Sequence, residues 1–69
     1  MISVRQFARQ NPGLVRRDLD AMNEGWDPAE YVDDSELYRA YVGAAGIEQG
    51  SDEDADVIDQ VLDVLGWEG

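Results

Sequence analysis

The chain has 69 residues, 43% of them hydrophobic, and its sixteen acidic side chains outnumber five arginines to give a net charge of −11. Cysteine and histidine are absent, which excludes disulfides, thiolate or imidazole metal sites, and catalysis by a cysteine nucleophile or a histidine base. The hydrophobic content is too high for a disordered acidic tail, so the acidity belongs to a folded surface. We therefore expect residues 1–69 to form a single acidic helical domain that is not an enzyme.

The charges are divided unevenly along the chain. Residues 1–17 hold four arginines and no acid, whereas residues 18–69 hold all sixteen acids and one arginine. A domain with this much self-repulsion is stabilised by internal pairing, so we expect the arginines to be partly neutralised by packing on the acidic remainder. The alternative is a separate positive pole. No apolar run approaches the roughly 20 residues of a membrane span and no signal peptide is recognisable, so we expect a cytoplasmic protein without membrane contact.

The first part of the chain predicts two helices. Ser3 begins an S-x-x-Q capping box, which predicts a short helix that ends near Gln10. Asn11 and Pro12 are typical of an N-cap and a first helical position, and they predict a second helix over residues 12–23. Four apolar residues of this helix are expected to face inward: Leu14, Val15, Leu19 and Met22. Asp18 falls in the same arc, and if it is buried it needs a partner, for which an arginine is the obvious candidate.

The middle of the chain predicts a short helical piece followed by a longer helix. Asp27, Pro28 and Glu30 stand in the order of a cap, a first helical position and an N3 acid, which predicts helix through Val32. Ser35 either caps a fresh helix or is crossed by a continuous one. Residues 36–45 share an apolar arc, and three tyrosines are expected in the core: Tyr31, Tyr38 and Tyr41.

The last helix, predicted over residues 52–65, has the strongest pattern in the chain. Apolar residues fill one half of its helical wheel. Ser51 is its expected N-cap with Asp54 in the N3 place, and the pair Gly66 and Trp67 predicts a Schellman end. Because no stretch alternates with period two, the predicted fold class is all-α, a small bundle of four to five short helices.

Four aspartates line up along the polar side of this helix: Asp52, Asp56, Asp59 and Asp63. The row spans roughly 16 Å, with about 5.5 Å between neighbours, which is comparable to the spacing of phosphates along a DNA strand. The simplest alternative is that an amphipathic helix needs a polar exposed side. However, aspartate is a mediocre helix former, and like charges four residues apart are destabilising. The row therefore indicates selection for something other than helix stability.

A second acidic group precedes and begins the tyrosine-bearing helix: Asp27, Glu30, Asp33, Asp34 and Glu36. These residues suit capping and solvation, but beside the last helix they would extend its negative surface. We expect Asp52, Asp56, Asp59 and Asp63 to be the principal partner contacts, and Asp33, Asp34 and Glu36 the secondary ones.

The opening of the last helix has the aspartate spacing of an EF-hand calcium loop, but it departs from that motif at two places. Val57 stands where the loop needs glycine, and Asp63 stands where it needs a bidentate glutamate. We therefore expect no metal site, and we expect no cofactor.

In its size, charge, lack of cysteine and histidine, and acidic stripe, the chain resembles the small phage-encoded inhibitors that mimic nucleic acid, anti-CRISPR proteins in particular. The resemblance covers the whole chain as a type, and no motif matches position by position, so no functional residue carries over. It implies a non-enzymatic inhibitor, monomeric or weakly dimeric, in the host cytoplasm. The implied partner is a basic nucleic-acid-binding protein or ribonucleoprotein, such as a CRISPR effector complex, whose access to DNA or RNA is blocked. Direct nucleic-acid binding is not expected, because the net charge repels it.

Two other hypotheses fit the same composition. The chain is an antitoxin or immunity protein that covers the basic site of a nuclease, or it is a helical adaptor whose acidity reflects a halophilic environment. The second is favoured by ten aspartates and no lysine. A halophilic domain needs high salt to fold, whereas a mimic folds in ordinary buffer and loses its partner as salt rises.

Overall fold

The computed structural model describes residues 2–67, which form four α-helices and one 3₁₀-helix and contain no strand. The elements are α1 (Val4–Gln10), α2 (Pro12–Asn23), η1 (Val32–Asp34), α3 (Glu36–Ala45) and α4 (Asp52–Leu65). The predicted all-α class is therefore confirmed.

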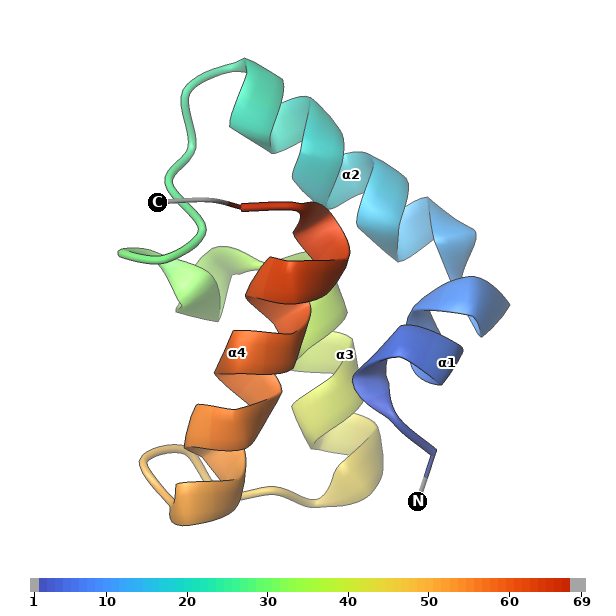
Figure 1. The fold of residues 1–69 in the computed structure, drawn as a ribbon, viewed down its shortest axis with the longest axis vertical. Helices are drawn as coiled ribbons and strands as arrows, with labels where there is room; N and C mark the ends of the chain where they lie inside the picture. Colours follow the sequence, from blue (N-terminus) through green and yellow to red (C-terminus); the bar gives the residue numbers. More distant parts are fainter. Residues whose placement is uncertain (1, 68–69) are drawn as a thin grey trace.

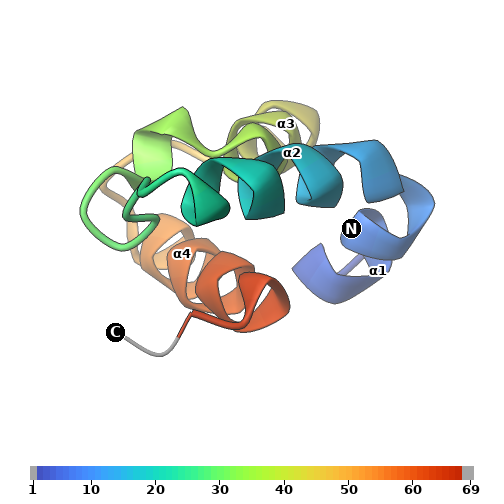
Figure 2. The same ribbon diagram turned by 90° about the horizontal axis from the view of Figure 1, so that it is seen from above.

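The helices α3 and α4 form an antiparallel pair joined by the loop of residues 46–51 (Figure 1). The helix α2 crosses the end of this pair and contacts chiefly α3, as the view from above shows (Figure 2). The helix α1 packs chiefly on α4. As a result, the arginine-bearing first quarter of the chain lies against the end of the acidic last helix.

The core is formed by α1, α3 and α4, which supply all the buried hydrophobic residues of the helices: Val4, Ala8, Leu37, Tyr38, Tyr41, Val57, Val61 and Leu65. Phe7 meets Tyr41 edge to face, with 5.3 Å between the ring centroids. The Tyr41 hydroxyl also donates a hydrogen bond to the carbonyl oxygen of Ile2 at 2.6 Å. These contacts fasten the short α1, which is too short to be a stable helix by itself.

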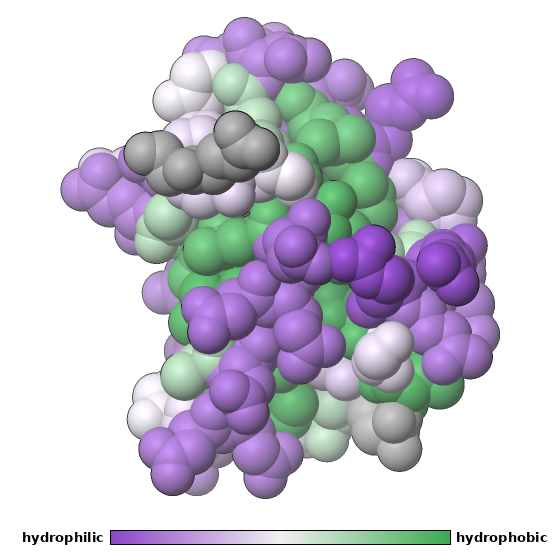
Figure 3. All heavy atoms as spheres, in the orientation of Figure 1, coloured by the Kyte–Doolittle hydropathy of each residue, from purple (hydrophilic) through white to green (hydrophobic). Residues whose placement is uncertain are grey.

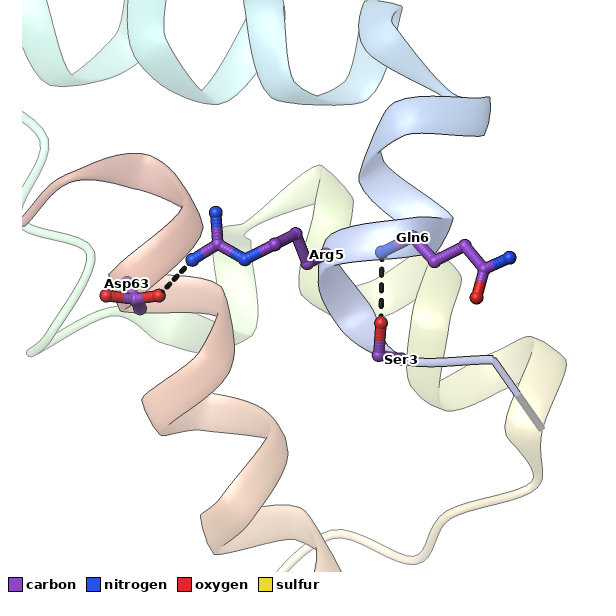
Figure 4. Close-up of polar contacts among 4 residues, drawn as sticks. All are labelled: Ser3, Arg5, Gln6 and Asp63. Atoms are coloured by element: carbon purple, nitrogen blue, oxygen red, sulfur yellow. Dashed lines mark hydrogen bonds and ion pairs between the residues drawn. The ribbon is translucent and has the colours of Figure 1, made fainter.

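Serine caps begin three of the helices. The caps at Ser3 and Ser51 were predicted, and of the two alternatives for Ser35 the structure has the cap of a fresh helix. The hydroxyl oxygens of Ser3, Ser35 and Ser51 each accept a hydrogen bond from the backbone N–H three residues later (Figure 4 for Ser3). The helix α4 ends in the predicted Schellman motif, because Gly66 has a φ of +73° and the N–H of Trp67 donates to the Leu62 carbonyl at 3.0 Å.

The segment between α2 and α3 differs from the prediction of helix through Val32. The Asp27 carboxylate does cap the segment, because it accepts from the N–H groups of Ala29 and Glu30 at 2.9 and 3.1 Å. The helical turn does not continue, because Tyr31 adopts φ −120° and ψ 47°. A separate short helix, η1, begins only at Val32.

The helix α2 is held on the bundle by a buried carboxylate, and here the expectation of an arginine partner was wrong. Asp18 is 2% exposed and accepts three hydrogen bonds from the first turn of α3. The donors are the Ser35 hydroxyl at 2.6 Å and the backbone N–H groups of Glu36 at 2.8 Å and Leu37 at 3.2 Å. A carboxylate here satisfies N–H groups that have no partner within the helix and also interacts favourably with the helix dipole.

Two residues expected in the core are exposed. Leu19 is 39% exposed and Tyr31 is 53% exposed. Because Asp18 points at α3, the next side chain along α2 is turned by about 100° and comes to lie at the edge of the bundle. Tyr31 lies in the non-helical backbone before η1, so the helical spacing that buries Tyr38 and Tyr41 does not extend to it.

Candidate functional site

The candidate site is the outward side of α4. Val57, Val61 and Leu65 are buried in the core, which fixes the rotation of the helix. The four aspartates on the other side are consequently all exposed: Asp52, Asp56, Asp59 and Asp63. Figure 3 shows this side as a hydrophilic band along α4, next to a hydrophobic area that lies between α4 and α2. The structure thus brings the four predicted principal contacts together on one face.

One of the four aspartates is paired with an arginine of α1. A guanidinium N–H of Arg5 donates to the Asp63 carboxylate, which is the one ion pair within residues 2–67 (Figure 4). The two side chains are 58% and 70% exposed, so the pair contributes little to stability. The remaining aspartates, Asp52, Asp56 and Asp59, have no ion pair within the described chain.

Asp54 lies in the acidic first turn of α4, as Asp52 does, but its side chain points to the opposite side of the helix. Its carboxylate accepts from the Tyr38 hydroxyl at 2.5 Å and from the Gly50 N–H at 3.1 Å, and the residue is 6% exposed. Burial and the hydrogen bond to Asp54 raise the pKa of Tyr38 to about 12. Asp54 therefore joins α4 to α3, and it is separated from the exposed carboxylates on either side of it.

The secondary acidic residues have different neighbours. The Asp33 carboxylate accepts from the Gln49 side chain at 3.5 Å, which places it beside the loop that leads into α4. Asp34 and Glu36 instead line a cavity of about 390 Å³ that also includes Arg17 and Trp26. Asp33 is therefore placed near the start of the aspartate row, whereas Asp34 and Glu36 line the cavity beside α2.

Within residues 2–67, the expected partial neutralisation of the N-terminal arginines consists of one ion pair, at Arg5. Arg9, Arg16 and Arg17 are exposed and have no ion pair within residues 2–67. The first quarter of the folded chain is therefore mainly a positive region beside a strongly negative one.

Within residues 2–67, no group of three or more acidic side chains is placed to hold a metal ion. None of the helices in that range has the length and apolar character that a membrane crossing demands.

Comparison of the chain with protein-family models, curated proteins and solved structures gives no match. A row of exposed carboxylates on a rigid helix can bind a surface of arginine and lysine side chains, and the field of −11 charges steers such a surface toward it.

Sequence reasoning missed the groove between α1, α2 and α4 where Arg5, Arg9 and Arg16 surround Leu19. A signal for it was present in α2, where Asp18 interrupts the apolar arc. A buried Asp18 requires a rotation of α2 that leaves Leu19 at the surface, but that rotation depends on the distant first turn of α3.

Proposed function

We propose that the protein is a non-enzymatic inhibitor that mimics nucleic acid. Its exposed aspartates occupy the basic surface with which a partner holds DNA or RNA, such as the surface of a CRISPR effector complex, and they block access of the target. The contact involves no reaction and requires no cofactor. Asp52, Asp56 and Asp59 are its centre.

The observation that carries this proposal is the exposure on one helix of three aspartates, Asp52, Asp56 and Asp59, that have no ion pair within residues 2–67. Arginines are available in the same small molecule, yet Arg5 reaches only the last position of the row. Three uncompensated charges persist although pairs three and four residues apart repel each other, and release of this repulsion by a basic partner would favour binding.

At the end of the row, Asp63 binds the partner only after its own ion pair with Arg5 is exchanged. Because Arg5 is exposed, a partner's arginine or lysine can replace it at little cost. Asp33 supplies an additional charge near the beginning of α4, whereas Asp34 and Glu36 belong to the cavity beside α2 and are peripheral to the contact.

The experiment that tests the proposal is capture of partners from a lysate of the native cells on the immobilised chain, at low and at high salt. Proteins that bind through the row are expected to be released as salt rises and to be displaced by duplex DNA, because DNA competes for the same basic surface. Retention that duplex DNA and RNA do not reduce would contradict mimicry.

The same capture experiment tests the first of the two other hypotheses, and circular dichroism tests the second. A captured nuclease whose cleavage the chain inhibits would identify an immunity protein or antitoxin, which uses the same charges on a different partner. A halophilic adaptor would lack helical structure in ordinary buffer and gain it in molar KCl, as measured by circular dichroism.

A further inference from the structure

The two large hydrophobic side chains that are exposed within residues 2–67 lie in opposite electrostatic surroundings. Leu19 lies in a groove of about 320 Å³ between α1, α2 and α4, with Val15 and Val64 beside it and Arg5, Arg9 and Arg16 around it. No acidic side chain lines this groove. Because Arg5 is paired with Asp63, Arg9 and Arg16 supply the positive rim of this apolar floor, on a molecule of strongly negative net charge.

Tyr31 has the complementary surroundings. It is 53% exposed in the segment between α2 and η1, and exposed carboxylates flank it on both sides: Glu30, Asp33 and Asp34. No basic residue occurs between Asp18 and Tyr38 in the sequence. Tyr31 is thus an aromatic side chain between negative charges. We call residues 30–34 the Tyr31 loop.

We propose that the groove around Leu19 binds the Tyr31 loop of a second copy of this chain. The aromatic ring would cover Leu19 and Val15, and the flanking carboxylates would face Arg9 and Arg16. Each part covers hydrophobic area that is otherwise in contact with water, and each supplies charges opposite to those of its counterpart. An aromatic side chain that enters an apolar pocket with a polar rim is the typical centre of a protein interface.

A second copy is favoured over an unrelated partner because both halves of the contact are present in the same chain. The contact does not involve the aspartates of α4, so it does not depend on the proposed function. The net charge of each copy opposes association, and the contact is small, so the self-association is expected to be weak and to be observed at about 10 µM to 1 mM protein.

Paired charge reversals test the contact by sedimentation velocity at increasing concentration. The variants Arg16→Glu and Glu30→Arg each place like charges on both sides of the contact and should remain monomeric where the wild type associates. A mixture of the two should associate again, because the arginine introduced at position 30 of one copy then faces the glutamate introduced at position 16 of the other, and the second combination is native. Arg39→Glu, an exposed reversal on α3 outside the groove, is the control because it makes the same change of net charge as Arg16→Glu. It should associate only slightly more weakly than the wild type and clearly more strongly than Arg16→Glu.

Tyr31→Ser tests the aromatic side chain without a change of charge and should weaken association about tenfold or more. Circular dichroism of each variant ensures that a monomeric result reflects a folded chain. Both a closed dimer and a longer series of oligomers would support the contact. A wild type that stays monomeric to about 1 mM, or a mixture of folded variants that stays monomeric, would overturn the proposal.

Discussion

Asp18 is the residue that determines how α2 sits on the bundle. All of its hydrogen bonds within the described chain go to the first turn of α3, and α2 buries no other residue fully, the hydrophobic ones included. The attachment of this helix therefore depends on one carboxylate together with the partly buried Leu14, Val15 and Met22.

Replacement of Asp18 by alanine should lower the free energy of unfolding by about 2–4 kcal/mol, because the hydroxyl of Ser35 and two N–H groups of α3 lose their acceptor. Urea denaturation measures this change. The matched control is Asp20→Ala on the exposed side of the same helix, which should change stability by less than about 0.5 kcal/mol. Equal effects of the two substitutions would show that the hydrogen bonds of Asp18 are unimportant.

Tyr38 should make the protein less stable as the pH becomes alkaline. The folded state raises the pKa of its hydroxyl from 10.0 to about 12, so the folded state holds this proton more tightly than the unfolded chain does. The resulting stabilisation is present below pH 10.0 and is lost as the pH rises toward about 12.

The variant Tyr38→Phe isolates this effect. It should be less stable than the wild type by about 1–2 kcal/mol at neutral pH, because Asp54 loses the hydroxyl donor. The difference between the two proteins should then shrink as the pH is raised from about 9 to about 12 in a series of urea denaturations. A difference that stays constant over this range would contradict the raised pKa.

At the scale of the elements, one glycine inside α3 and one at its C-cap should respond oppositely to replacement by alanine: the first gains stability and the second loses it. Gly43 lies inside the helix and a Cβ there would meet nothing within 4 Å, so Gly43→Ala should stabilise by about 0.5–1 kcal/mol. Gly46 ends the helix at a φ of +68°, where an alanine is strained, so Gly46→Ala should destabilise by about 1 kcal/mol. Thermal unfolding of the two variants measures both signs, and a stabilising Gly46→Ala would contradict the left-handed end.

The elements show which parts of this fold could be predicted from the sequence. The bounds of α2 and α4 were predicted correctly because they depend on local signals, such as Pro12, Ser51 and Gly66. The exposure of the aspartate row also followed from helical periodicity in α4. Local patterns of this kind involve residues within one turn of each other.

The features that local sequence patterns did not predict depend on contacts between distant residues. The partner of Asp18 lies 17 to 19 residues away, and the pairing of Arg5 with Asp63 spans 58 residues. The groove around Leu19 depends in turn on the rotation that Asp18 imposes on α2. The exposure of Tyr31 depends on where one helical turn stops, which the cap at Asp27 does not determine.

At the scale of the whole molecule, charge repulsion should limit stability at low salt. The molecule measures 30 × 24 × 17 Å and carries a net charge of −11. The Debye length falls from about 30 Å at 0.01 M salt to about 8 Å at 0.15 M, so repulsion across the whole molecule is screened over this range. We expect the chain to be folded at both concentrations, with a melting temperature about 4–8 °C higher at 0.15 M.

Circular dichroism during thermal unfolding measures this difference. A melting temperature that does not change would show that the acidic surface is already compensated within the molecule. An unfolded chain at about 0.15 M salt that folds only in molar KCl would favour the halophilic explanation of its composition.

The measurement that tests the central claim most directly compares two double charge reversals in binding to the captured partner. Asp56→Lys with Asp59→Lys reverses the centre of the row, whereas Asp20→Lys with Glu24→Lys makes the same change of net charge at exposed sites on α2 and its C-cap. With both proteins folded, the first should lose affinity by about tenfold or more and cease to inhibit nucleic-acid binding, and the second should stay within about threefold of the wild type. Equal affinity of the two variants would contradict the claim that the aspartates of α4 are the binding site.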